Sequence, residues 1–269
     1  MNPPTHKDWK WQLRHQIKSL KQLEDAFPLS TEERDAIVQL DHKFKLGITP
    51  YYLSLMDPEN IQCPIRRQAI PLLAEQHTQA NEMPDPLAED RDMPVIGLAN
   101  RYPNRALLYV THTCAVYCRH CTRRRKVGDP SSHQSTNKLD QAIEWIKCNP
   151  RINDVVLSGG DPLSLSDSRL DSLLSKLRPL VPIIRIGTRH PTTLPQRITT
   201  SLCEVLKKYP PLYVMTHFNH PKECTPEAAL ALNRLADAGC VLSNQTVLLK
   251  GINDNSKTQE ELHLWLLQN

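Results

Sequence analysis

The sequence predicts an α/β protein in which a helical N-terminal region precedes a series of parallel βα units. In the first 80 residues, apolar side chains recur at three- and four-residue spacing, which is typical of amphipathic helices. After residue 95 the pattern changes to short apolar runs that alternate with helical segments. Such alternation is typical of a barrel or of an open α/β sheet. We therefore expect two parts, residues 1–95 and residues 96–269.

Two local signals define the N-terminal helices. One is an apolar face interrupted by Lys, Arg and Gln, formed by Trp9, Leu13, Ile17, Leu20 and Leu23. The other is Ser30 followed by Glu33, a capping box that predicts a helix beginning at Thr31. Residues 83–94 carry three prolines and no periodicity, so we expect an irregular connection to the second part.

The second part contains five predicted strands with a predicted helix between each pair. The strands are expected at residues 106–110, 154–157, 183–186, 212–215 and 241–249. The helices are expected at residues 139–147, 170–177, 198–208 and 226–238. Because a helix separates consecutive strands, the strands should run parallel and place their carboxyl ends along one edge of the sheet.

Composition excludes several classes of protein. Of the 269 residues, 23% are charged and 39% are hydrophobic, which lies outside the range of disordered, collagen-like and disulfide-scaffold proteins. No apolar run approaches the roughly 18 residues of a membrane span. The N-terminus lacks the apolar core of a secretory signal. We therefore expect a cytoplasmic protein with eight reduced cysteines and no membrane partner.

The charge distribution gives little support for a nucleic-acid partner. A net charge of +4 neither requires nor excludes one. Arg119 and residues 123–126 form a basic run, but the run is short and has no interleaved aromatic side chains. We expect no nucleic acid, and we interpret Arg124 and Arg125 as ion-pair formers.

Three closely spaced cysteines follow the first predicted strand. Cys114, Cys118 and Cys121 have the spacing C-x3-C-x2-C, which allows three thiolates to wrap one metal centre. A closed zinc site or an electron-transfer cluster uses four ligands, so one coordination position is left over. A structural zinc site completed by His120 or His112 is the alternative. The other five cysteines are expected to be small buried hydrophobic residues: Cys63, Cys148, Cys203, Cys224 and Cys240.

Further candidate residues follow the later strands. Gly159 and Gly160 come directly after the second predicted strand, where two residues without Cβ let the backbone approach a ligand; a plain tight turn is the alternative. His217 and Gln245 lie on the fourth and fifth strands or just after them, which places them on the same rim as the cysteine loop. Without a ligand they would be satisfied polar groups of the core.

These residues and their neighbours resemble the lysine 2,3-aminomutase family of radical S-adenosylmethionine (SAM) enzymes. The resemblance rests on residues 101–105, 117–125, 158–162, 216–221 and 249–254. It implies a partial open (β/α) barrel of the radical SAM type after the helical region. In that superfamily three cysteines hold three irons of a 4Fe-4S cluster, and SAM chelates the fourth iron.

The resemblance implies a role for each candidate residue. It assigns Cys114, Cys118 and Cys121 to the metal and Arg123 to the carboxylate of an amino-acid substrate, which suits the bidentate guanidinium. It assigns SAM binding to His120, Ser158, Gly159, Gly160, Asp161, His217 and Gln245. It assigns pyridoxal phosphate binding to Arg101, Tyr102 and Arg105, which we place before the first strand.

The implied activity is movement of an amino group from C2 to C3 of an amino acid, with L-lysine to β-lysine the leading candidate. Sister reactions on glutamate or arginine, and the branch that makes β-lysine for a translation factor, remain open. Two other classes are a passive iron-sulfur electron carrier and a zinc-stabilised nucleic-acid-binding module. The implied partners are a small amino acid, a reductant such as flavodoxin or ferredoxin, and further copies of the chain.

The family's pyridoxal-phosphate lysine lies in a glycine-rich segment past a further strand. After Asp254 the sequence has 15 residues and no such segment, and Lys250 matches a different family segment. We therefore expect the 269-residue chain to bind the cluster and SAM without completing the reaction, and its binding of pyridoxal phosphate is in doubt.

Overall fold

A six-stranded sheet with strand order β1-β2-β3-β4-β5-β6 forms the larger part of the protein. The structure is a computed structural model that describes residues 8–41, 43, 45–77, 82–128 and 135–269. The strands are β1 (Leu98–Tyr102), β2 (Arg105–Thr111), β3 (Asp154–Gly159), β4 (Ile183–Gly187), β5 (Leu212–Thr216) and β6 (Val241–Asn244). The pairs from β2 to β6 are parallel, and β1 pairs antiparallel with β2. The sheet does not close, because β1 and β6 are its two ends, so the predicted partial open barrel is confirmed.

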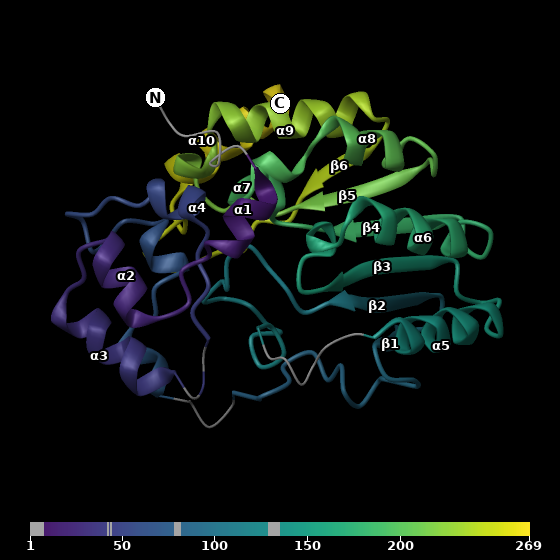
Figure 1. Cartoon of the computed structure of the whole chain (residues 1–269), viewed down its shortest axis with the longest axis horizontal. Helices are drawn as coiled ribbons and strands as arrows, with labels where there is room; N and C mark the ends of the chain where they lie inside the picture. Colours follow the sequence, from purple (N-terminus) through teal and green to yellow (C-terminus); the bar gives the residue numbers. More distant parts are fainter. Residues whose placement is uncertain (1–7, 42, 44, 78–81, 129–134) are drawn as a thin grey trace.

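Amphipathic helices follow the parallel strands and cover one face of the curved sheet (Figure 1). They are α5 (Thr136–Lys147), α6 (Asp167–Leu177), α8 (Thr200–Leu206) and α9 (Pro226–Asp237), all four at the predicted places. Each begins after a Ser or Thr whose hydroxyl accepts a backbone N–H of the first turn. In α6 the buried side is Leu170, Leu173, Leu174 and Leu177, and these side chains join the strand residues in one core.

The N-terminal region is helical, with one interruption that the periodicity does not reveal. Its helices are α1 (Trp9–Arg14), α2 (Leu20–Ala26), α3 (Thr31–Leu40) and α4 (Pro50–Ser54). The capping box of Ser30 and Glu33 at the start of α3 is confirmed. Between α1 and α2 the chain leaves the helix, because the backbone of Ile17 exchanges two hydrogen bonds with Ile48, at 2.9 and 3.1 Å. A tertiary contact therefore overrides the helical spacing there.

Two strand predictions need correction. Leu98–Tyr102 is a strand, so Arg101 and Tyr102 lie on an antiparallel edge strand and not in a loop before the sheet. The last strand ends at Asn244, and residues 245–249 continue without strand structure. Residues 83–94 form turns, as expected for a connection. A division into parts at residue 95 stays a prediction.

The N-terminal region holds the cysteine loop that follows β2. Gln16 donates its side-chain N–H groups to the carbonyls of Cys114 and Ala115, at 2.9 and 2.8 Å. Ile48 forms a β-bridge with Val116. Since the parallel strands point toward the N-terminal helices (Figure 1), these contacts lie at the carboxyl ends of the strands. In the described residues, no helix is both long and apolar enough to span a membrane.

Candidate active site

A cavity of about 240 Å³ lies at the carboxyl ends of the strands, where parallel α/β sheets bind their ligands. Its wall brings together most of the residues singled out from the sequence. They are Cys114, Cys118, His120, Cys121, Arg123, Ser158, Gly159, Gly160, Asp161, His217 and Gln245. The topology explains this gathering, because each of these residues lies in a loop directly after β2, β3, β5 or β6, or at the end of its strand.

The three cysteines are free thiols on one wall of this cavity. Burial raises the pKa of Cys114 well above its usual range, and the nearby Asp161 adds to that effect. Burial likewise raises the pKa of Cys121, to about 11. Among the described residues, no three His, Cys, Asp or Glu side chains are gathered into a finished metal site. Because thiolates and not thiols bind metals, these cysteines have to lose their protons when they bind a metal.

Two neutral imidazoles lie beside the cysteines. The rings of His120 and His217 stack, with centroids 5.3 Å apart and planes 23° from parallel. Burial lowers the pKa of His120 to about 2 and of His217 to about 3, and Arg189 contributes in both cases. His120 Nδ1 and His217 Nε2 are buried and have no hydrogen-bond partner among the described residues. Such atoms are candidate hydrogen-bonding groups for a polar ligand.

The structure shows one physical reason for the two glycines, and their contact with a ligand stays a prediction. A Cβ on Gly159 would lie 2.5 Å from Thr111 O, and one on Gly160 would lie 2.5 Å from Thr113 O. The backbone before the cysteine loop therefore fills the space that a side chain would take. Gly160 N donates to Thr111 O at 2.6 Å in the same contact.

Asp161 uses its carboxylate within the protein. Both oxygens accept from the Thr188 hydroxyl, at 2.8 and 2.9 Å, and Oδ2 accepts from Arg189 N at 2.7 Å. His190 Nδ1 lies 2.7 Å from the same oxygen. Burial alone would raise the pKa of Asp161, but His190 and these donors hold it below its usual value. The carboxylate joins the end of β3 to the loop after β4.

A second cavity of about 350 Å³ adjoins the first, and Arg123 lies on the wall of both. Arg123 forms an ion pair with Glu89, with Nη2 2.5 Å from Oε1, and donates to Ser158 Oγ at 3.3 Å. The Tyr109 hydroxyl donates to Glu89 Oε2 at 2.5 Å. Glu89 comes from the connection before β1, so that segment contributes to the site.

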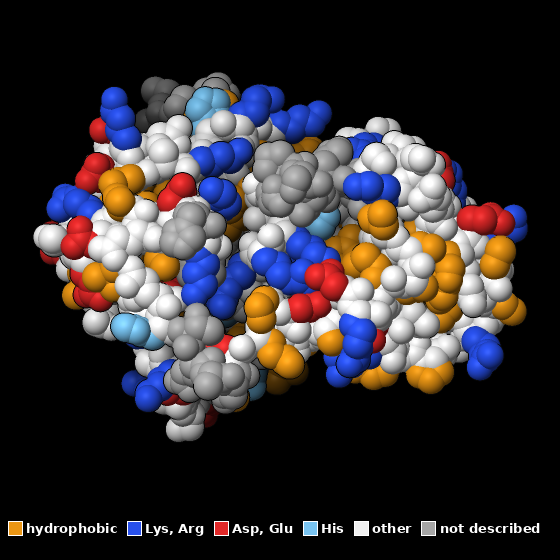
Figure 2. Space-filling view, turned by 90° about the horizontal axis from the view of Figure 1, so that it is seen from below, with side chains coloured by type: hydrophobic (Ala, Val, Ile, Leu, Met, Phe, Trp, Pro, Cys, Tyr) orange, Lys and Arg blue, Asp and Glu red, His pale blue; other side chains and the backbone are white. Residues whose placement is uncertain are grey.

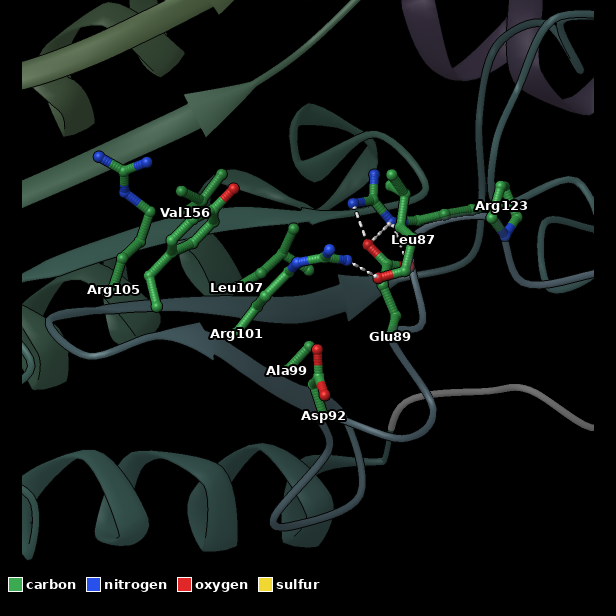
Figure 3. A pocket seen from close by; sticks show the side chains of 11 residues that line it. Leu87, Glu89, Asp92, Ala99, Arg101, Arg105, Leu107, Arg123 and Val156 are labelled. Carbon is green, nitrogen blue, oxygen red and sulfur yellow. Dashed lines mark hydrogen bonds and ion pairs between the residues drawn. The ribbon is translucent and has the colours of Figure 1, made fainter. Parts of the chain in front are cut away.

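Arg101, Tyr102 and Arg105 line this second cavity, as their predicted grouping requires. Figure 3 shows Arg105 at the end opposite Arg123, and the guanidinium groups of Arg101 and Arg105 point in opposite directions. Each has a protein partner, since Arg101 donates to Leu87 O and Arg105 pairs with Asp154, both at 2.6 Å. In this structure the guanidinium groups of Arg101 and Arg105 therefore do not converge on one part of the cavity.

The basic run is largely balanced by acidic side chains. Arg125 forms ion pairs with Asp85 and Asp90, and Lys126 also pairs with Asp90. This confirms the expectation for Arg125. Arg124 donates to the backbone carbonyl of Arg119, and its role as an ion-pair former stays a prediction. On the face shown in Figure 2, basic and acidic side chains lie against each other near the centre.

The sequence interpretation missed three residues of the site. Glu89 lies in the connection, Arg189 follows β4, and Glu223 follows β5. Arg189 donates to Cys118 Sγ at 2.7 Å and pairs with Glu223 at 2.6 Å. For Arg189 a signal existed, because it follows a predicted parallel strand in the same way as His217.

The fold and the site define a class of protein. Residues 108–260 match the family model described as "Radical SAM superfamily". The chain therefore belongs to the radical SAM superfamily.

Within that superfamily the chain is similar to curated amino-acid aminomutases. It is 50% identical over 257 residues to an L-lysine 2,3-aminomutase of Fusobacterium nucleatum, covering 95% of this chain and 60% of the relative. It is 48% identical to the L-lysine 2,3-aminomutase of Clostridium subterminale, covering 95% and 62%. It is 42% identical over 269 residues to the glutamate 2,3-aminomutase of Clostridioides difficile, covering 98% and 64%. The chain thus spans less than two thirds of the length of these relatives.

The residues present fit the cofactors of the superfamily. Three thiols on one cavity wall form a soft donor set suited to iron-sulfur chemistry. The unpartnered nitrogens of His120 and His217 lie on the same wall. One cavity therefore holds the donors for a metal and for a polar ligand beside it.

Proposed function

We propose that this chain carries the radical SAM part of a 2,3-aminomutase, which moves an amino group from C2 to C3 of an amino acid. The observation that carries the proposal is the pair of adjoining cavities with Arg123 on the wall of both. One cavity contains the three cysteines, and the other contains Arg101, Tyr102 and Arg105. A substrate held at Arg123 would face both.

Cys114, Cys118 and Cys121 hold a 4Fe-4S cluster in this proposal, and the surrounding cavity holds SAM. When bound, the cluster and SAM supply one-electron chemistry, and pyridoxal phosphate supplies an aromatic ring that delocalises an unpaired electron. Ser158, Gly159, Gly160 and Gln245 line the SAM side. We assign Asp161 to positioning, because its carboxylate is already engaged with Thr188, Arg189 and His190.

Arg123 binds the carboxylate of the substrate and orients it between the cavities. Glu89 now occupies part of the guanidinium, so a substrate carboxylate has to share Arg123 with Glu89 or displace it. Tyr109 and Ser158 fix the other sides of this pair. Because His120 and His217 remain neutral at working pH, they add no positive charge beside the cofactor.

L-lysine is the proposed substrate, since the L-lysine 2,3-aminomutases of Fusobacterium nucleatum and Clostridium subterminale are 50% and 48% identical to the chain and the glutamate enzyme of Clostridioides difficile is 42% identical. The proposed partners are a small amino acid, an external reductant of the flavodoxin or ferredoxin kind, and further copies of the chain. A cytoplasmic location agrees with the eight free cysteines, which persist in a reducing compartment.

The test uses the anaerobically reconstituted chain with dithionite, SAM, pyridoxal phosphate and L-lysine labelled with ¹⁵N at C2. We expect 5′-deoxyadenosine by chromatography and ¹⁵N retained at C2 by NMR, with L-glutamate as the comparison substrate. The Cys118→Ala variant is the matched control, and it should form no 5′-deoxyadenosine. A chain that binds iron but forms no 5′-deoxyadenosine with L-lysine would contradict the proposed function, whereas ¹⁵N bonded to C3 would show that this chain completes the migration by itself.

A further inference from the structure

Arg189 is a buried cation aimed at one of the three cysteines. Its Nη1 donates to Cys118 Sγ at 2.7 Å, and only 9% of its surface is exposed. A guanidinium stays protonated in proteins, so this contact places a full positive charge against the sulfur. Cys121 Sγ, by contrast, accepts from a backbone N–H, that of Arg123, at 3.3 Å.

The rest of the guanidinium is locked in place from two sides. Nη2 donates to Glu223 Oε1 and to Gln68 Oε1, both at 2.6 Å, and to the Tyr52 hydroxyl at 3.1 Å. Glu223, Gln68 and Tyr52 are at most 1% exposed. Gln68 and Tyr52 come from the N-terminal region, whereas Glu223 follows β5. Nη1 is therefore held toward Cys118 by groups that do not depend on a bound ligand.

Glu223 is fixed as firmly as Arg189. Its Oε1 also accepts from the Tyr52 hydroxyl at 2.9 Å, and its Oε2 accepts from Asn219 N at 2.6 Å. The arginine and the glutamate form a buried ion pair with one end on the cysteine. Removing one member of such a pair leaves the other charge uncompensated.

We propose that Arg189 is a positioning residue that orients Cys118 and raises the reduction potential of the iron-sulfur centre. Hydrogen bonds and positive charge at a ligand sulfur stabilise the reduced, more negative state of a cluster. The carboxylate of Glu223 opposes this effect and limits it. The inference rests on the proposed function, because it requires Cys118 to be a cluster ligand.

The test is a redox titration of the reconstituted chain, followed by electron paramagnetic resonance. At a fixed potential, Arg189→Gln should lower the ratio of reduced to oxidised cluster at least tenfold. For a one-electron couple, this corresponds to a fall of about 59 mV in the reduction potential. Arg189→Lys should show a smaller fall, since it keeps the charge. Glu223→Gln should shift the potential in the opposite direction. If Arg189 and Glu223 only stabilised the fold, their variants would not shift the reduction potential in opposite directions.

Arg197→Gln is the matched control. Arg197 is fully buried and pairs with Asp167 at 2.8 Å, but it donates to Leu163 O and Leu165 O and not to a cysteine. Its loss should lower stability and leave the potential unchanged. If Arg189→Gln does not fold, the opposite shifts of Arg189→Lys and Glu223→Gln decide the matter.

Iron content separates the two proposals. A wild-type chain that binds no iron after reconstitution would overturn both the proposed function and this inference. A chain that binds iron but keeps its potential in Arg189→Gln, or in both Arg189→Lys and Glu223→Gln, would overturn the inference about Arg189 alone. An equal shift in Arg197→Gln would overturn it as well.

Discussion

Arg123 Nη2 lies 2.5 Å from Glu89 Oε1, and this ion pair forms part of the boundary between the two cavities. Glu89 Oε1 and Oε2 each also lie 3.0 Å from Arg123 Nε. The carboxylate thus occupies Nε and Nη2 of the guanidinium that the family resemblance assigns to the substrate. Under the proposed function, Glu89 is an internal carboxylate that would orient Arg123 before a substrate binds.

We expect Arg123→Lys to weaken amino-acid binding much more than SAM binding. An ammonium cannot make two parallel hydrogen bonds, and the loss of charge-assisted bonds of about 1.5–3 kcal/mol raises the dissociation constant roughly tenfold or more. Isothermal titration with L-lysine and with SAM measures both. Arg125→Lys is the control, because Arg125 pairs with Asp85 and Asp90 and lies on neither cavity wall. Equal weakening of both ligands would remove Arg123 from the substrate site.

Gly160→Ala should disturb the cysteine loop. The new Cβ would lie 2.5 Å from Thr113 O and 2.8 Å from His112 C, directly before Cys114. We expect a loss of about 3 kcal/mol in the free energy of unfolding, measured in urea, together with reduced iron binding. Gly239→Ala separates the two effects, since its φ is +78° but nothing lies within 4 Å of its Cβ. That variant should lose only about 1–2 kcal/mol and keep its iron.

The Arg66–Glu33 pair should stabilise the N-terminal region strongly. Arg66 Nη2 lies 2.6 Å from Glu33 Oε2, with side chains 2% and 4% exposed. Arg66→Met leaves a buried carboxylate without its partner, and we expect a loss of about 3–5 kcal/mol in urea unfolding. Arg34→Met breaks the exposed pair with Glu24, at 46% and 38% exposure, and should cost at most about 1 kcal/mol. Similar losses in both variants would contradict this assignment.

His217 should make the protein less stable in acid. Burial lowers its pKa to about 3 in the folded chain, with a further contribution from Arg189, whereas the unfolded value is about 6.5. Below pH 6.5 the unfolded chain therefore binds a proton that the folded chain does not, and stability falls as the pH falls. By pH 5 this single group should cost about 2 kcal/mol relative to pH 7. In urea titrations, the free energy of unfolding of His217→Gln should fall by about 2 kcal/mol less between pH 7 and pH 5 than that of the wild type. An equal fall in both proteins would contradict the low pKa of His217.

The sequence predicts the α/β core well, because buried strands and amphipathic helices carry local periodic signals. It also places Cys118 and His217 on one rim, since residues that follow parallel strands converge there. It does not reveal the contact of Glu89 with Arg123 or that of Arg189 with Cys118, which join residues 34 and 71 positions apart. No local pattern records such pairs. The strand Leu98–Tyr102 is missed because it is a short edge strand whose last two residues are exposed.

We expect Cys114, Cys118 and Cys121 to be the only protein ligands of a 4Fe-4S cluster with one iron open to SAM. The most direct measurement is electron paramagnetic resonance of the reconstituted, reduced chain before and after SAM is added. Replacing the other five cysteines, Cys63, Cys148, Cys203, Cys224 and Cys240, should leave about four irons per chain and a spectrum that SAM perturbs. Replacing any one of the three by Ala should abolish both. Loss of the cluster in the five-cysteine variant, or a spectrum indifferent to SAM, would contradict the account.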